Sequence, residues 1–158
     1  MTSTEARSLE MANTDAIAKE IVLRAPRSRV WRALTDSAQF GTWFRVKLEG
    51  PFEAGRTVRG AMTYPGHEGK VIELMVETIE PETVFVYRWH PYDPNVDVSK
   101  EPTTKVEFRL EDAAGGTKLS LVESGFDRLP ASRRADAFRR NEGGWTSQLE
   151  NIRRYVEG

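Results

Sequence analysis

Hydrophobic residues recur along most of this chain with a period of two, the pattern of β-strands that bury one face. The first such segment, residues 17–24, carries Ile17, Ile21 and Leu23 at even spacing. The alternation returns in residues 46–49, 58–64, 72–77, 85–89, 104–110 and 119–121. Short turns separate several of these segments, and Gly115-Gly116 is a strong hairpin signal. Consecutive strands joined by short turns are predicted to be antiparallel.

The period becomes helical in two places. Residues 27–34 place Val30, Trp31 and Leu34 on one face after Pro26, which suits the first turn of a helix. A second short helix is expected through Phe40 to about Trp43. After Pro130, apolar residues recur at intervals of three, four and seven along a helix of roughly 25 residues. This stripe consists of Phe138, Trp145, Leu149, Ile152 and Val156.

The order of elements predicts an α+β fold of the helix-grip kind. A curved antiparallel sheet of six or seven strands surrounds the long C-terminal helix, and two short helices follow the first strand. Residues 15–158 are expected to form this single domain. Residues 1–14 are polar and aperiodic, so we expect a disordered or loosely ordered tail.

This arrangement predicts an internal cavity, because one helix about 10 Å wide is narrower than the sheet that it must cover. The large residues on the inner face would line it, and several combine an apolar body with a polar tip. The predicted lining is Trp43, Met62, Tyr64, Leu74, Phe85, Tyr87, Trp89, Phe108, Leu121, Trp145 and Leu149. The alternative is that these side chains fill a core at ordinary density.

Gly143 and Gly144 lie inside the predicted helix, where each glycine costs about 0.8–1 kcal/mol relative to alanine. We expect them to allow a close approach to the helix by a strand, a ligand or the Trp145 ring. A tolerated kink is the alternative.

Composition narrows the classes of function. Lys and Arg number 23 against 24 Asp and Glu, so no charge bias favours nucleic acid or an anionic membrane. There is no cysteine and only two histidines, which argues against a metal centre and excludes thiol chemistry. No apolar run approaches the roughly 20 residues that span a bilayer, and no signal peptide is recognisable. We therefore expect a cytoplasmic protein without a cofactor.

Catalytic motifs are missing from the sequence, so no catalytic residue is assigned. Tyr64, Tyr87 and Glu123 are the only candidates by strand parity for chemistry inside the cavity. For Glu123 an unpartnered inward carboxylate would be costly, and we expect a strand-end residue paired with an arginine of the last helix. His67 is expected in a solvated turn, and His90 on the surface at a strand end.

Two groups of residues resemble motifs of a known family. The first runs Ala25-Pro26, Val30-Trp31, Leu34-Thr35-Asp36 and Trp43-Phe44; it resembles the opening motif of the START-like (SRPBCC) superfamily. The second runs Glu123-Ser124-Gly125-Phe126, Gly144-Trp145, Leu149 and Tyr155-Val156. It resembles the closing motif of the heat-shock chaperone ATPase activator-like branch.

The resemblance covers about residues 15–157. It implies a helix-grip fold, often with a hydrophobic pocket, and it implies no shared catalytic residues. In the eukaryotic namesake, a co-chaperone, this kind of domain follows a separate N-terminal domain, whereas only a short tail precedes the expected first strand here.

Three functions follow as hypotheses. The first is binding or carrying a small hydrophobic or aromatic molecule in the cavity. The alternatives are a chaperone-interaction module that uses the outer sheet face, and an enzyme that acts on a pocket-bound apolar substrate. Monomer and homodimer are both compatible with the pattern, and the sequence identifies neither ligand nor pathway.

Overall fold

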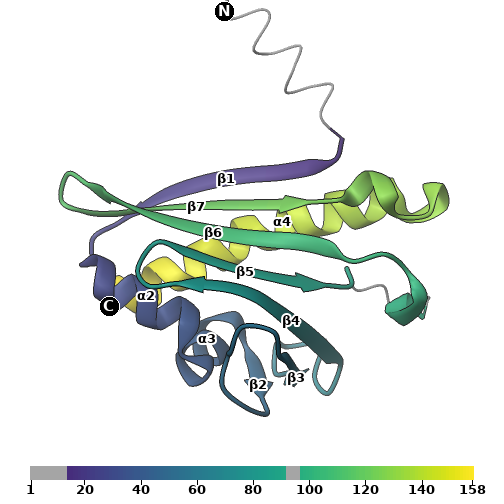
Figure 1. The fold of residues 1–158 in the computed structure, drawn as a ribbon, viewed down its shortest axis with the longest axis horizontal. Helices are drawn as coiled ribbons and strands as arrows, with labels where there is room; N and C mark the ends of the chain where they lie inside the picture. Colours follow the sequence, from purple (N-terminus) through teal and green to yellow (C-terminus); the bar gives the residue numbers. More distant parts are fainter. Residues whose placement is uncertain (1–13, 92–96) are drawn as a thin grey trace, which may run out of the picture.

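Seven strands form one antiparallel sheet that curls around a long C-terminal helix in the computed structural model, which describes residues 14–91 and 97–158 (Figure 1). Their order across the sheet is β1-β7-β6-β5-β4-β3-β2. The strands are β1 (Ala16–Leu23), β2 (Val46–Leu48), β3 (Thr57–Met62), β4 (Val71–Glu80), β5 (Val84–Trp89), β6 (Thr104–Ala113) and β7 (Gly116–Ser124). The helices are α2 (Arg27–Thr35), α3 (Ser37–Phe44) and α4 (Ala131–Glu157). The predicted helix-grip fold is confirmed.

One residue separates the two short helices. Asp36 ends α2, and its Oδ1 accepts hydrogen bonds from the backbone N–H groups of Ala38 (3.0 Å) and Gln39 (3.2 Å) at the start of α3. This cap satisfies two of the donors that a helix N-terminus leaves without partners. Pro26 is the N-cap of α2, one position before the first turn in which the sequence placed it.

The sheet buries one face of each long strand. Along β7 the buried positions alternate with half-buried ones, and Thr117, Leu119, Leu121 and Glu123 share the inner face. The same alternation in β6 buries Val106, Phe108 and Leu110. These strands pack their apolar face against α4, as the two-residue period predicted.

The helix α4 carries the stripe that its sequence indicates. Trp145, Leu149, Ile152 and Val156 are buried, and Phe138 is partly buried against the same cluster. At its C-terminal end, the Arg29 guanidinium donates to the carbonyl oxygens of Tyr155 (2.9 Å) and Val156 (3.0 Å). A cation at these carbonyls satisfies acceptors that the helix leaves without partners. The helix is thereby fixed to α2 at this end.

Two local expectations need correction. Within the described part of the chain no strand approaches Gly143 or Gly144, because a Cβ built on either has no heavy atom within 4 Å beyond its chain neighbours and the helix's own backbone. The strand expected to reach Tyr64 ends at Met62, so Tyr64 lies in the following turn. Arg133, near the start of α4, is buried.

Two predicted segments are only partly described. The predicted tail, residues 1–14, lies outside the described residues except for Thr14, whose hydroxyl donates to Asp127 Oδ1 (2.7 Å). Of the expected loop 90–102, residues 92–96 lie outside them as well.

Candidate functional site

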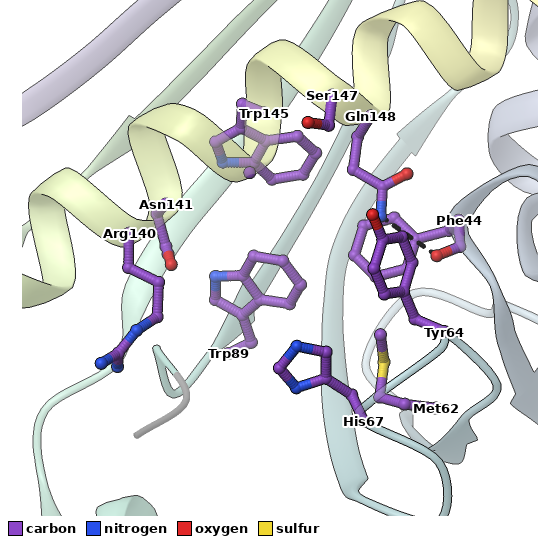
Figure 2. A pocket seen from close by; sticks show the side chains of 11 residues that line it. Phe44, Met62, Tyr64, His67, Trp89, Arg140, Asn141, Trp145, Ser147 and Gln148 are labelled. Atoms are coloured by element: carbon purple, nitrogen blue, oxygen red, sulfur yellow. Dashed lines mark hydrogen bonds between the residues drawn. The ribbon is translucent and has the colours of Figure 1, made fainter. Parts of the chain in front are cut away.

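A cavity of about 280 Å³ opens between α4, the end of α3, the end of β5 and the turn after β3 (Figure 2). A smaller hollow of about 130 Å³ adjoins it, because the two have Phe44, Met62, His67, Trp89 and Asn141 in common. The remaining lining residues of the larger cavity are Tyr64, Arg140, Gly144, Trp145, Ser147 and Gln148. The lining is therefore largely apolar, with polar groups toward α4.

Two tryptophans form the aromatic wall of this cavity. Trp89 at the end of β5 and Trp145 on α4 are stacked, with ring centroids 5.6 Å apart and planes inclined by 27°. Phe44 lies 5.9 Å from the Trp89 ring and 6.1 Å from the Trp145 ring, between centroids. Offset and edge-on contacts of this kind are favourable for aromatic pairs. The three rings come from three elements, which fixes the shape of the wall.

Behind this wall lies the carboxylate of Glu123, which has no exposed surface. Its Oε1 accepts the indole N–H of Trp145 (2.8 Å), and its Oε2 accepts the indole N–H of Trp89 (2.8 Å). The Thr104 hydroxyl donates to Oε2 (2.6 Å), and the Asn141 amide donates to both oxygens (3.0 Å each). One carboxylate therefore joins β5, β6, β7 and α4.

This donor set suits an ionised carboxylate. Indole N–H and amide NH₂ groups only donate hydrogen bonds, and an ionised carboxylate, which only accepts them, satisfies every donor of this set. The same rule fixes the amide of Asn141, because only its nitrogen can bind Glu123. Its oxygen is then directed away from the carboxylate, toward the cavity that Asn141 lines (Figure 2).

The expected arginine partner of Glu123 is therefore wrong. Within residues 14–91 and 97–158, the hydrogen bonds of Glu123 all come from neutral donors, and no arginine of α4 is among them. The strand parity of Glu123, which it shares with Leu119 and Leu121, did indicate that its side chain points inward. What the sequence did not reveal is that two tryptophans and an asparagine, distant in the chain, supply its partners.

Tyr87, next to this network on β5, has a buried hydroxyl that finds no hydrogen-bond partner among the described residues. Burial disfavours the charged phenolate, and the nearby Glu123 charge disfavours it further, so the pKa of Tyr87 is raised well above its ordinary value of 10.0. Tyr87 stays protonated over the ordinary pH range and is unsuited to act as a base.

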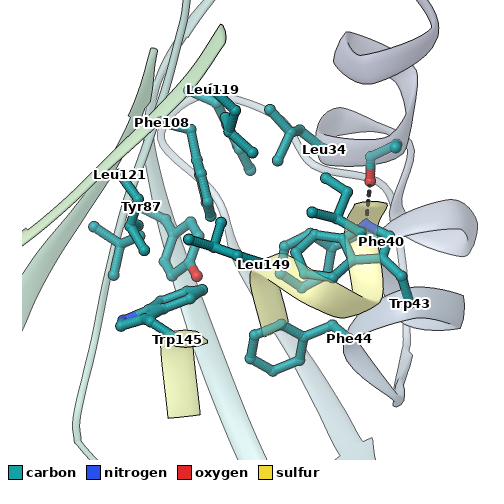
Figure 3. Packing of buried hydrophobic residues seen from close by; sticks show 14 of the residues in the cluster. Leu34, Phe40, Trp43, Phe44, Tyr87, Phe108, Leu119, Leu121, Trp145 and Leu149 are labelled. Carbon is teal, nitrogen blue, oxygen red and sulfur yellow. Dashed lines mark hydrogen bonds between the residues drawn. The ribbon is translucent and has the colours of Figure 1, made fainter. Parts of the chain in front are cut away.

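The structure divides the predicted lining residues into two groups. Met62, Tyr64, Trp89 and Trp145 line the cavity. The other seven line neither hollow and lie in the buried hydrophobic cluster of the molecule, part of which Figure 3 shows. These are Trp43, Leu74, Phe85, Tyr87, Phe108, Leu121 and Leu149. Phe108, for example, contacts Phe85, Tyr87 and Trp145 with centroid distances of 5.8–6.3 Å.

Sequence reasoning missed several residues of the cavity. Phe44 and Asn141 line both hollows, and nothing in the strand or helix periodicity distinguishes them. His67 is exposed in its turn as expected, yet it lines both hollows. His90 is half-buried rather than on the surface, and within residues 14–91 and 97–158 its Nδ1 has no hydrogen-bond partner.

The described residues contain no group of three or more His, Cys, Asp or Glu side chains able to hold a metal ion. None of their helices is long and apolar enough to cross a membrane. Glu123 is shielded behind the tryptophans and already accepts four donors. It therefore acts as a fixed charge within the wall, while the cavity itself offers apolar surface.

Comparison with known proteins agrees with this fold. Residues 24–157 match the family model described as "Activator of Hsp90 ATPase homolog 1-like protein". No protein among those with curated descriptions matches the chain in sequence.

Solved structures give similar matches. Protein MLL2253 from Mesorhizobium loti is 24% identical with a TM-score of 0.72, over 90% of this chain and 96% of that one. The Aha1 dimer from Colwellia psychrerythraea is 17% identical with a TM-score of 0.68, over 90% and 96%. DynU16, from the dynemicin biosynthetic locus, is 25% identical with a TM-score of 0.69 over 90% of this chain, which spans about half (47%) of DynU16.

Proposed function

This chain belongs to the family of Activator of Hsp90 ATPase homolog 1-like proteins, within the START-like superfamily, and from that premise we propose that it binds a small apolar or aromatic molecule. The binding site is the cavity in front of Trp89 and Trp145. The observation that carries the proposal is the aromatic wall around a cavity of about 280 Å³. Ligand sites are typically concave and largely apolar, with a few placed polar groups.

The volume indicates the size of the ligand. Ligand cavities begin at roughly 300 Å³, so the space suits a molecule of one or two rings, and the adjoining hollow gives room for a short substituent. Of the predicted lining residues, Met62, Tyr64, Trp89 and Trp145 are the proposed contacts. DynU16 supports a role with small molecules only through the biosynthetic locus from which it comes.

Gly143 and Gly144 allow a matched test. Both lie in α4, and beyond chain neighbours and the helix's own backbone a Cβ on either has no described atom within 4 Å, but only Gly144 lines the cavity. Replacing either by leucine gains helix propensity to a similar extent. Only Gly144→Leu places a side chain in the ligand space.

The measurement is titration of each protein with the neutral two-ring fluorescent probe 6-propionyl-2-(dimethylamino)naphthalene. We expect one probe per chain in the unmodified protein and in Gly143→Leu, and at least about tenfold weaker binding in Gly144→Leu. Equal affinities in the two variants, or many probes per chain, would refute the proposal.

The family description favours a second candidate, contact with a heat-shock chaperone. The exposed outer face of the sheet would be the contact surface. To test this candidate, the ATPase rate of the host chaperone is measured with and without micromolar concentrations of the present protein. An unchanged rate together with no co-purification would reject it.

A further inference from the structure

The charged residues that line the two hollows are all of one sign. Lys70 lines the smaller hollow, and Arg140 lines the larger cavity. Two further residues of the smaller hollow, His67 and His90, carry imidazole groups. Within the part of the chain that the structure describes, no Asp or Glu side chain lines either space. The lining therefore favours a negatively charged group over a positive one.

One buried polar atom of the smaller hollow lacks a partner. His90 is half-buried, and its Nδ1 makes no hydrogen bond within residues 14–91 and 97–158. A buried polar atom without a partner costs free energy, so such an atom beside a hollow indicates a group that binds there. One nitrogen of a neutral imidazole carries a proton, and in the tautomer with Nδ1–H this atom donates to an anion.

The turn after β3 brings the other two polar groups to the same hollow. The backbone N–H of Met62 donates to the carbonyl oxygen of Lys70 (2.7 Å), and the backbone N–H of Lys70 donates to that of His67 (3.2 Å). These bonds fix the turn that carries both side chains. β5 ends at Trp89, directly before His90, so this turn and the end of β5 meet at the hollow.

Two nearby carboxylates are bound to other groups. Glu123 has no exposed surface and accepts its four donors behind the tryptophan wall. Asp97 accepts hydrogen bonds from the hydroxyl (2.6 Å) and the backbone N–H (3.1 Å) of Ser99. These bonds lower the pKa of Asp97, and the charge of His90 lowers it further. Neither carboxylate lines the smaller hollow, which therefore offers positive charge and N–H donors to a ligand.

The larger cavity continues the hollow with apolar surface. Met62 and Trp89 line both spaces and are half-buried, so part of each side chain is open to a ligand. A planar ring on Trp89 would bury apolar surface and place a short substituent in the smaller hollow. The hollow of about 130 Å³ exceeds several times the roughly 30 Å³ that one water molecule occupies, so a carboxylate fits.

We propose that the ligand carries a carboxylate on a planar apolar body, and that Lys70, His67 and His90 bind this carboxylate in the smaller hollow. The inference rests on the proposed function and names the chemical class of its ligand. Lys70 supplies charge, and the two imidazoles supply donors, whose hydrogen bonds are stronger to an ionised acceptor than to a neutral one. Arg140, an exposed residue of the larger cavity, adds a field of the same sign.

The test compares two probes of nearly equal shape. 2-Naphthoate is an anion at about pH 7.5, where a carboxyl group is ionised, and 2-naphthamide is its neutral counterpart. Isothermal titration calorimetry measures the affinity and the stoichiometry of each. We expect one 2-naphthoate per chain, bound about tenfold more tightly than 2-naphthamide, equivalent to about 1.4 kcal/mol.

Lys70→Gln removes the charge from the proposed subsite. We expect the ratio of the two affinities to fall to about two, while the affinity for 2-naphthamide changes by less than about threefold. The control is Lys118→Gln on β7, which lines neither hollow and pairs with Glu111 (3.3 Å) and Glu20 (3.7 Å). The control protein should keep the tenfold ratio.

A second variant covers the case in which Lys70→Gln does not fold. His90→Phe keeps a ring but removes Nδ1, and it should lower the ratio about threefold. A full preference for 2-naphthoate in either folded variant would overturn the assignment of the smaller hollow as the carboxylate subsite.

The unmodified protein gives a decisive result by itself. Equal affinities for the two probes, or tighter binding of 2-naphthamide, would overturn this inference and leave the proposed function standing. Binding of neither probe would overturn both.

Discussion

At the scale of single residues, Glu123 determines more of the site than any side chain that lines it. Its carboxylate has no exposed surface and accepts hydrogen bonds from Trp89, Thr104, Asn141 and Trp145. Each of these donors would be buried or half-buried without a partner if the carboxylate were absent. Each buried donor that loses its partner costs about 1–3 kcal/mol, and removal of this one carboxylate leaves several donors without a partner at once.

We therefore expect Glu123→Leu to lower the free energy of unfolding by about 3 kcal/mol or more. Urea denaturation followed by tryptophan fluorescence measures it. Glu111→Leu on the neighbouring strand is the control, because Glu111 is exposed and should change stability by less than about 0.5 kcal/mol. Similar losses in the two variants would show that Glu123 has no special role in stability.

Substitution of Tyr87 is expected to affect stability in the opposite direction from substitution of Glu123. Its buried hydroxyl has no hydrogen-bond partner in the part of the chain that the structure describes, so Tyr87→Phe removes a desolvated polar group and should be neutral or stabilising by up to about 1 kcal/mol. Because the pKa of Tyr87 is raised in the folded state, Tyr87 is protonated in both the folded and the unfolded chain below about pH 10, and its ionisation in the unfolded chain lowers the stability as the pH rises further.

Denaturation at a series of alkaline pH values tests this. Stability should fall more steeply above about pH 10 in the unmodified protein than in Tyr87→Phe. Parallel pH profiles would mean that Tyr87 titrates as an ordinary tyrosine.

At the scale of elements, a buried ion pair ties the segment before β6 to the start of α4. Arg133 Nε donates to both carboxylate oxygens of Glu101 (2.8 and 3.1 Å), and its guanidinium also donates to the carbonyl oxygen of Pro91 (3.1 Å). The two side chains are only 7% and 13% exposed. This contact places the N-terminal half of α4 next to the end of β5, where Trp89 and the cavity lie.

Arg133→Met should cost about 3 kcal/mol, because it leaves Glu101 largely buried without its cation. The matched control is Arg139→Met on the same helix. Arg139 pairs with Asp136 on the surface, and exposed pairs contribute less than about 1 kcal/mol. Thermal unfolding of both variants measures the difference, and equal midpoints would contradict a structural role for the buried pair.

At the scale of the whole molecule, the interior is divided into a packed region and an open one. The sheet, α2, α3 and α4 contribute to one hydrophobic cluster, part of which Figure 3 shows. Aromatic contacts extend through the cluster from Phe52 to Trp145. The cavity lies where this cluster ends, beyond the Trp89–Trp145 pair. Because α4 is narrower than the sheet, the helix does not fill the whole interior, and the unfilled space lies on this side.

A single shared cluster predicts that residues 15–158 unfold as one cooperative unit. Far-ultraviolet circular dichroism reports the helices and strands, and tryptophan fluorescence reports the cavity wall. The two denaturation curves should coincide. Separate transitions would show that the domain comprises more than one folding unit.

Much of this organisation was predictable from local patterns. Alternation along residues 104–110 and 119–121 gave the inner face of β6 and β7, because side chains of a strand point to opposite faces by geometry. The same parity directed Glu123 inward. The helix stripe from Trp145 to Val156 likewise follows from the 3.6-residue period.

Which inward residues form a cavity and which fill the core was decided only by tertiary structure. Phe85 and Phe108 have the same strand pattern as Trp89, yet the first two are packed among other rings and the third borders open space. Periodicity specifies the face of a residue, but the gap left beside a helix depends on how the sheet curls and where the helix lies. The partners of Glu123 also come from β5, β6 and α4, and only the folded chain brings these elements together.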